Sequence, residues 1–124
     1  MNSNSTVATL PASDIDRAKA FYRDKLGLTV TTEFPGGANF GDGSNQLSVY
    51  LAGGTSPGTF TQVTFLVDDV PAVVADLRAK GVEFQEYDMP ELKTEDGVAT
   101  GPDGSKLAWF KDSEGNIAGI IQPG

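Results

Sequence analysis

The sequence predicts an α+β fold made of two tandem βαβββ modules. The main observation is an internal repeat: a short strand pattern, a capped amphipathic helix and three further strand patterns occur twice in the same order. The two expected capping residues, Asp14 and Asp69, are 55 positions apart, and the two expected helix ends, Gly27 and Gly81, are 54 apart. Alternating apolar and polar residues in the strand patterns indicate sheets with two different faces.

The first module begins with a strand at residues 7–10. A helix starts at Ser13 or Asp14, carries a mainly apolar stripe at helical spacing, and ends at Gly27. Strands are expected at residues 28–34, 38–40 and 46–52, with turns at 35–37 and 41–43 where glycines gather.

The second module repeats this order. A strand at residues 62–67 precedes a helix that Asp68 or Asp69 caps, with Pro71 in its first turn and an apolar stripe ending before Gly81. Strands are expected at residues 82–87, 107–111 and 117–122, the last two joined by a turn at 114–116. Residues 88–98 are expected to be irregular, with Pro90 and Gly97 inside them.

The length and composition favour one domain, residues 1–124. With 124 residues, of which 39% are hydrophobic, the chain suits a single core. Module one is placed at about residues 5–52, a linker rich in Gly, Ser, Thr and Pro at about 53–60, and module two at about 61–122. No signal pattern opens the sequence and no apolar run is long enough to cross a bilayer, so a cytoplasmic protein without a membrane partner is expected.

The absence of two residue types and the net charge of the chain exclude several classes of function. The chain has no Cys and no His, which excludes disulfides, thiolate sites and catalytic triads that need a His. The net charge is −8, with 9 basic and 17 acidic residues, so a nucleic acid is not an expected partner.

Each module has one helix for one sheet and so leaves a sheet face uncovered. Two modules side by side are expected to form a curved, cup-shaped mixed sheet with the helices on the outside. A small ligand would bind in the hollow of such a cup.

Three segments resemble the vicinal oxygen chelate superfamily, which includes glyoxalases, extradiol dioxygenases and bleomycin-resistance proteins. They are SDIDRAKAFY at residues 13–22 followed by LGL at 26–28, FLVDDV at 65–70, and WFKDSEGN at 109–116. In the last segment Ser113 and Glu114 replace the Pro and Asp usual in that superfamily. The resemblance implies the two-module fold but not one activity, because this fold carries many chemistries.

The resemblance also implies where a metal would be held. The ligand positions fall on Val7, on Gln62, on Gly119 and on either Ser48 or Tyr50. Val and Gly offer no ligating side chain, so we expect no metal, no other cofactor and no catalytic residue of the metal-dependent kind.

Strand parity and residue type select candidate ligand contacts. Aromatic rings could stack on a planar ligand, and the loop at residues 88–98 could form a lid. The alternatives are a cup filled by its own side chains, core positions for the aromatic residues, including Phe21 and Tyr22, and a solvated loop. The candidates are Val7, Thr9, Phe40, Ser48, Tyr50, Gln62, Thr64, Met89, Leu92, Trp109 and Gly119.

These observations favour a metal-independent protein that binds an apolar or aromatic small molecule, with resistance by sequestration as one role. A homodimer is expected, as in the bleomycin-resistance branch that the chain resembles. Two alternatives stay open: a metal-free lyase or isomerase that uses a carboxylate or a Tyr, and a non-catalytic interaction subunit whose cup has collapsed.

Overall fold

The computed structural model describes residues 1–42 and 45–124, so Gly43 of the turn expected at 41–43 lies outside the described residues. The chain divides into two compact units, Met1–Pro57 with Ser113–Asn116, and Gly58–Asp112 with Ile117–Gly124. Each contains one mixed four-stranded sheet, and the predicted α+β class with two repeated modules is confirmed.

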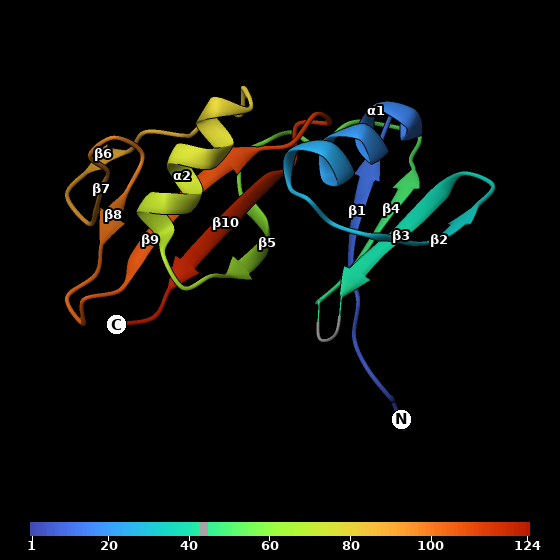
Figure 1. Ribbon diagram of the computed structural model, residues 1–124, viewed down its shortest axis with the longest axis horizontal. Coiled ribbons are helices and arrows are strands. Elements are labelled where there is room, and N and C mark those ends of the chain that lie inside the picture. Colours follow the sequence, from blue (N-terminus) through green and yellow to red (C-terminus); the bar gives the residue numbers. More distant parts are fainter. Residues whose placement is uncertain (43–44) are drawn as a thin grey trace. The chain divides into compact units, whose positions relative to one another are not determined.

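The sheet of the first unit has the strand order β1-β4-β3-β2 (Figure 1). Strand β1 runs parallel to β4, and the other neighbours are antiparallel. The elements are β1 (Ala8–Ala12), α1 (Ile15–Ala20), the π-helical turn η1 (Phe21–Lys25), β2 (Val30–Phe34), β3 (Gly37–Asp42) and β4 (Asn45–Leu51).

Helix α1 covers one face of this sheet by packing on β3 and β4. Its first turn is capped by the Asp14 carboxylate, which accepts a hydrogen bond of 3.0 Å from the Arg17 backbone N–H. Phe21 and Tyr22 are buried in the core, as predicted, and the Tyr22 ring lies 5.7 Å from that of Phe40. Apolar side chains complete the layer from the sheet: Leu10, Ala12, Ala38, Leu47 and Val49.

The sheet of the second unit repeats the order as β5-β10-β9-β8. Strand β5 is parallel to β10, and α2 packs on β9 and β10. The N–H groups at the start of α2 are satisfied by two side chains, since Asp69 accepts from Ala72 and Gln122 accepts from Val70 at 2.9 Å. The elements are β5 (Thr61–Leu66), α2 (Val70–Ala79), β8 (Ala99–Thr100), β9 (Lys106–Lys111) and β10 (Ile117–Gln122).

The strand predicted at residues 82–87 is wrong. Only Phe84 forms a bridge there, to Phe110, and the Gln85 N–H donates to the Trp109 carbonyl at 2.8 Å. The chain then no longer pairs with β9. The later strand β8 pairs with another part of the same edge of β9. Strand pairing beside β9 is therefore split between two short segments, which local sequence patterns do not reveal.

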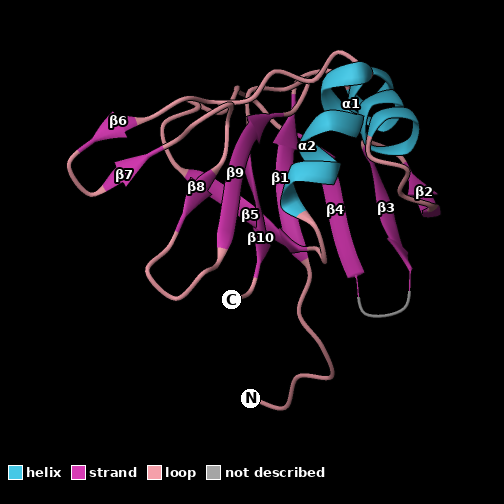
Figure 2. Ribbon diagram, turned by 60° about the vertical axis from the view of Figure 1, so that its left-hand side comes forward, coloured by secondary structure: helices cyan, strands magenta, loops and turns pink. Residues whose placement is uncertain are grey.

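The segment that connects Phe84 to β8 contains some regular secondary structure. Residues 88–98, predicted as irregular, contain a small hairpin of β6 (Asp88–Met89) and β7 (Leu92–Lys93) that stands off from β8 and β9 in Figure 2. Thr94 closes its base, since its hydroxyl accepts from the Tyr87 N–H at 2.8 Å and its own N–H donates to the Tyr87 carbonyl.

A buried carboxylate, Glu114, anchors the start of α1. The backbone N–H groups of Ser13 and Asp14 donate to it at 2.9 and 3.0 Å, and the Arg17 guanidinium donates through Nε at 2.6 Å and through a second nitrogen at 3.0 Å. The side chain of Glu114 is 1% exposed. The next residue but one, Asn116, donates to the Pro11 carbonyl at 2.9 Å. Residues about 100 positions apart thereby form one polar cluster.

The Glu114 carboxylate stays ionised in this cluster. Burial by itself would raise its pKa, but the hydrogen bonds from Arg17, Ser113 and the two backbone N–H groups outweigh burial and lower the pKa from 4.5 to about 2. Since the folded state binds this proton more weakly than the unfolded state, the cluster stabilises the fold fully above the ordinary pKa. The stabilisation is lost as the pH falls toward 2.

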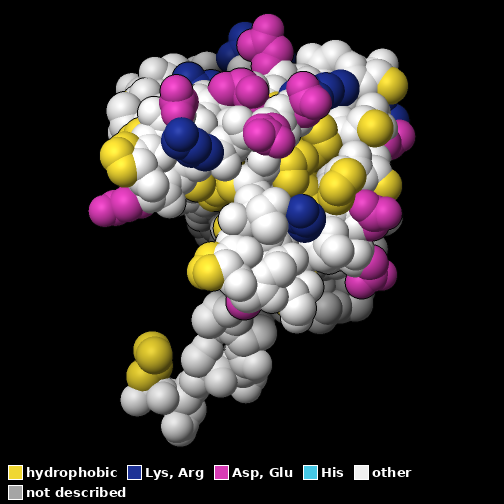
Figure 3. Space-filling view, turned by 90° about the vertical axis from the view of Figure 1, so that its left-hand side faces the viewer, with side chains coloured by type: hydrophobic (Ala, Val, Ile, Leu, Met, Phe, Trp, Pro, Cys, Tyr) yellow, Lys and Arg dark blue, Asp and Glu magenta, His cyan; other side chains and the backbone are white. Residues whose placement is uncertain are grey.

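No helix within residues 1–42 and 45–124 is long and apolar enough to cross a membrane. On the face drawn in Figure 3, Lys and Arg side chains are interspersed with Asp and Glu side chains. Both signs of charge therefore occur on this face, while the whole sequence has a net charge of −8.

We expect Glu114→Gln to lower the free energy of unfolding at pH 7 by about 2 kcal/mol, because an amide nitrogen would face the donating Arg17 guanidinium and a charge-assisted hydrogen bond to the buried carboxylate would be lost. Urea unfolding at pH 7 and pH 3 checks this, and the gap between variant and wild type should shrink at pH 3. Glu33→Gln is the matched control, since Glu33 forms an exposed pair with Lys19 and should change stability little. Equal effects of the two substitutions would contradict the anchoring role of Glu114.

Candidate functional site

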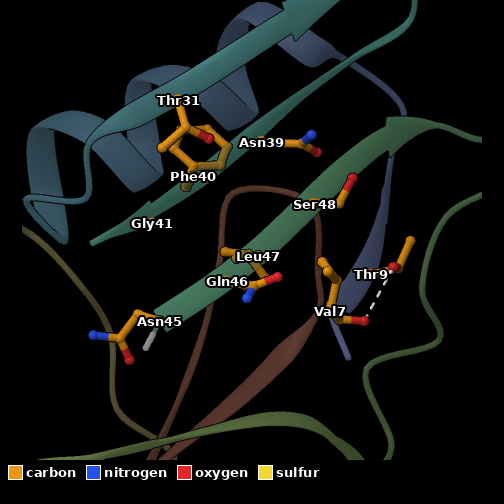
Figure 4. A pocket seen from close by; sticks show the side chains of 10 residues that line it. All are labelled: Val7, Thr9, Thr31, Asn39, Phe40, Gly41, Asn45, Gln46, Leu47 and Ser48. Carbon is orange, nitrogen blue, oxygen red and sulfur yellow. Dashed lines mark hydrogen bonds between the residues drawn. The ribbon is translucent and has the colours of Figure 1, made fainter. Parts of the chain in front are cut away.

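The face of the first unit's sheet that α1 leaves uncovered holds a pocket of about 660 Å³ (Figure 4). Its walls come from the segment before β1 and from strands β1, β2, β3 and β4 of that sheet. The pocket is lined by Val7, Thr9, Thr31, Asn39, Phe40, Gly41, Asn45, Gln46, Leu47 and Ser48.

Strand register places a row of polar side chains across the pocket. Ser48 on β4 is paired with Thr9 on β1 and with Asn39 on β3, so the three side chains share one face. Gln46 lies two residues before Ser48 on the same strand and belongs to the same face. The row can therefore offer hydroxyl and amide groups to one ligand.

Two local features shape the pocket. Gly41 lies opposite Gln46, and a Cβ there would collide with the Asn45 carbonyl oxygen, so no side chain fills this position. The pairing of β2 with β3 shifts register between Val30 and Thr32, and Thr31 in between lines the pocket. Val30 is paired with Phe40 of the core, so alternation places Thr31 on the open face, and the bulge lets Thr32 oppose Asn39 there as well.

The polar groups of this row are largely unused within the protein. Over residues 1–42 and 45–124, the side chains of Asn39, Gln46 and Ser48 make no hydrogen bond to another protein group, and the Thr9 hydroxyl makes one of 3.5 Å to the Val7 carbonyl. Asn39 and Ser48 are half-buried. Their hydrogen-bonding capacity is available to a ligand or to water.

The lining is also uncharged. None of the described residues that line the pocket carries a carboxylate, an ammonium or a guanidinium group. Acid–base chemistry by a lining side chain therefore has no obvious agent in this pocket.

Among the candidates predicted for the first unit, Val7, Thr9 and Ser48 line the pocket together. Tyr50 lies two residues beyond Ser48 on the same face, is 41% exposed and does not line it. Phe40 contributes to the wall, but its side chain is 2% exposed and packs on Tyr22 in the core.

Six lining residues were not among the predicted candidates: Thr31, Asn39, Gly41, Asn45, Gln46 and Leu47. The alternation of Gln46 with Ser48 carried a signal, since both fall on one strand face. Thr31 carried the same signal, since it alternates with Val30 in the strand expected at residues 28–34.

The candidates of the second unit gather around Trp109. Gly119 is paired with both Trp109 and Thr64, and a Cβ on Gly119 would lie 3.4 Å from the indole ring. The absent side chain lets the indole lie close to the sheet. The Tyr87 ring meets Trp109 edge to face at 5.4 Å. Gln62 lies on the same strand face as Thr64.

The predicted lid residues lie on the β6–β7 hairpin. Met89 is 47% exposed, and Leu92 is half-buried. Leu92 and Trp109 both border a cleft of about 220 Å³ beside β8. The structure thus brings Leu92, but not Met89, to a cavity wall with Trp109.

The positions that would hold the superfamily's metal do not fit one. In the first unit, Val7 offers no ligating side chain, and Ser48 or Tyr50 offers one hydroxyl; in the second, Gln62 offers one amide and Gly119 has no side chain. Across residues 1–42 and 45–124, no three Asp or Glu side chains are grouped as a metal would need. One amide and one hydroxyl are a poor donor set for a catalytic divalent ion.

We expect Tyr87→Leu to shift the fluorescence emission of Trp109 to longer wavelength, because the substitution removes the ring that shields one edge of the indole. The lost aromatic pair should also reduce stability by about 1 kcal/mol. Trp109 is the only Trp of the sequence, so its spectrum is unambiguous. Phe60→Leu, at an aromatic residue that is 60% exposed, is the control and should leave the spectrum unchanged. An unchanged spectrum in Tyr87→Leu would contradict the contact.

Solved structures of several known proteins have a fold similar to that of this chain. A lactoylglutathione lyase from Agrobacterium tumefaciens is 21% identical over 98% of this chain and 96% of its own, with a TM-score of 0.73. A bleomycin-binding protein in complex with bleomycin is 20% identical over 98% and 100%, with a TM-score of 0.74. TnmS3, an antibiotic-binding protein from Streptomyces sp. CB03234, is 25% identical over the whole of both chains, with a TM-score of 0.68.

No curated protein resembles the chain closely enough in sequence to count as a relative. The sequence model of one family does match, over residues 5–117, which is nearly the whole chain. With its two βαβββ modules, the chain belongs to the Glyoxalase/Bleomycin resistance protein/Dioxygenase superfamily.

Proposed function

We propose that the protein binds a small molecule on the open face of the first unit's sheet, without a metal, and sequesters that molecule unchanged. The observation that carries the proposal is the open pocket of about 660 Å³ with unused polar groups along one strand row. A volume of this size lies within the usual range for small-molecule sites.

The solved structures of similar fold support binding as a class of function. Two of them are named for binding bleomycin or an antibiotic, and the third is named as a lyase. The fold therefore does not choose between binding and catalysis, and the choice depends on the site.

The composition of the site favours binding over catalysis. A metal-free lyase or isomerase needs a group that accepts or donates a proton close to the reacting atom. The described lining residues supply only amides, hydroxyls and apolar groups. Tyr50, the nearest phenol along the strand, does not line the pocket. An open pocket also argues against a collapsed surface with an interaction role alone.

Filling the pocket tests the binding site. The probes are bleomycin, N,N′-diacetylchitobiose and 2-naphthol. We expect Ser48→Trp to abolish the thermal stabilisation that whichever of them binds gives the wild-type chain, because the indole would occupy the space beside Thr9 and Asn39. Thr59→Trp, at an exposed position of the linker, is the control and should respond like the wild type. Each variant is first checked for a cooperative melt without ligand.

Sequestration is tested in the same samples, by recovering the ligand and comparing its mass before and after incubation. An unchanged mass supports the proposal. A product that forms with the wild type and fails to form with Ser48→Trp would show catalysis at this pocket and overturn it.

Metal independence predicts that the untagged chain retains no stoichiometric Zn²⁺, Mn²⁺ or Ni²⁺ after gel filtration and that these ions leave its melting temperature unchanged. Ligand-linked stabilisation would be about 2.7 kcal/mol at an ion concentration 100 times Kd, so a real site would be visible. Elemental mass spectrometry and a thermal melt measure both. One ion per chain that disappears in Gln62→Ala would contradict the proposal.

A further inference from the structure

We infer that the pocket of the first unit takes an uncharged ligand rich in hydroxyl and amide groups, of the saccharide kind, in place of the apolar or aromatic class that the sequence favours. This inference rests on the proposed function, since it names the ligand class for that same pocket. It depends on four properties of the lining: its hydrogen-bonding groups, its lack of charge, its spacing and its aromatic border.

The first property is the mixed donor and acceptor character of the lining. Asn39 and Gln46 each carry an amide that donates and accepts, and Ser48, Thr9 and Thr31 carry hydroxyls that do both. A ligand with many hydroxyl groups needs partners of this adaptable kind. An apolar ligand would cover Asn39 and Ser48 without replacing their bonds to water, which is unfavourable for each half-buried group.

The second property is the absence of charge among the described lining residues. A charged ligand would give up hydration and meet no counter-ion among the described lining residues, which is costly. The acidic net charge of −8 further disfavours an anionic ligand at long range. An uncharged ligand meets neither obstacle.

The third property is spacing. Thr9, Ser48 and Asn39 lie on adjacent strands, so their side chains follow one another at about 4.8 Å, the usual distance between strands. Gln46 lies about 7 Å from Ser48 along the strand. These points form a small two-dimensional grid of polar groups. A ring with hydroxyls on several sides can contact more of such a grid than a linear chain can.

The fourth property is an aromatic border beyond Ser48. Tyr50 is the next residue on this strand face and is 41% exposed, and its strand partner is Gly37. The Phe34 ring lies over Gly37, where an added Cβ would collide with it. Exposed rings beside polar groups suit compounds with one apolar and one hydroxylated face.

The test compares neutral, charged and apolar probes on the full chain by two-dimensional ¹H–¹⁵N NMR. The neutral probes are N,N′-diacetylchitobiose and trehalose; the charged probes are chitobiose, which is cationic, and cellobiouronic acid; the apolar probe is 2-naphthol. Binding is assigned to the pocket when the amide signals of Thr9, Asn39, Gln46 and Ser48 shift with concentration.

Asn39→Leu is the diagnostic variant, since it keeps the size of the side chain and removes the amide. We expect it to weaken a neutral probe about threefold to tenfold, the usual effect of losing a hydrogen bond. Thr59→Ala, on the exposed linker, is the control and should bind like the wild type. A cooperative melt for each variant confirms that it is folded.

The outcomes separate this inference from the proposed function. Pocket shifts with the neutral probes that Asn39→Leu weakens would support the ligand class. Pocket shifts with 2-naphthol or a charged probe alone, or neutral binding that Asn39→Leu leaves unchanged, would overturn the ligand class and leave the proposed function standing. Pocket shifts with bleomycin alone would likewise overturn the ligand class and leave the proposed function standing. If the pocket signals stay unmoved by every probe and by bleomycin, both fail.

Discussion

The ionised carboxylate of Glu114 is the interaction on which the first unit depends. It satisfies the backbone N–H groups that start α1 and holds Arg17 beside them. Helix α1 then presents its apolar side to the sheet, where Tyr22 meets Phe40. With one face of β3 and β4 committed to this core, the alternate residues of the same strands are left on the open face. The polar row of the pocket is therefore a consequence of where the helix is anchored.

The Glu114 side chain suits its anchoring role through its length and its hydrogen bonds. The superfamily's usual turn carries an Asp at this position, whereas Glu114 has one more methylene and reaches both the guanidinium and two backbone donors. A buried carboxylate is tolerated only when several donors surround it, and here Arg17 supplies two of its hydrogen bonds. Asn116 extends the same cluster to the carbonyl of Pro11 in β1. The Glu114 carboxylate thus specifies how the turn that contains it joins β1 and α1.

The two units place different chemistry on equivalent sheet faces. In the first, strand pairs align Thr9, Ser48 and Asn39, which are small or amide-bearing residues. In the second, the equivalent row holds Thr64, Gly119 and Trp109, where the indole occupies the space that the glycine leaves. Gene duplication of a module can preserve the core while the open face diverges, since open-face residues contribute little to packing. Fold similarity to both a lyase and antibiotic-binding proteins is consistent with this freedom.

The two-module architecture can be predicted from the sequence, because helix periodicity, capping residues and strand alternation are local signals. Asp14, Asp69, Gly27 and Gly81 act where they were predicted to act, at the ends of helices. Parity also placed Thr9 and Ser48 on one face. Three features could not be predicted, because they depend on pairing between distant segments: the bulge between Val30 and Thr32, the split edge beside β9, and the approach of Glu114 to α1. Such pairing is decided by packing and hydrogen bonds across the fold, which no short stretch of sequence encodes.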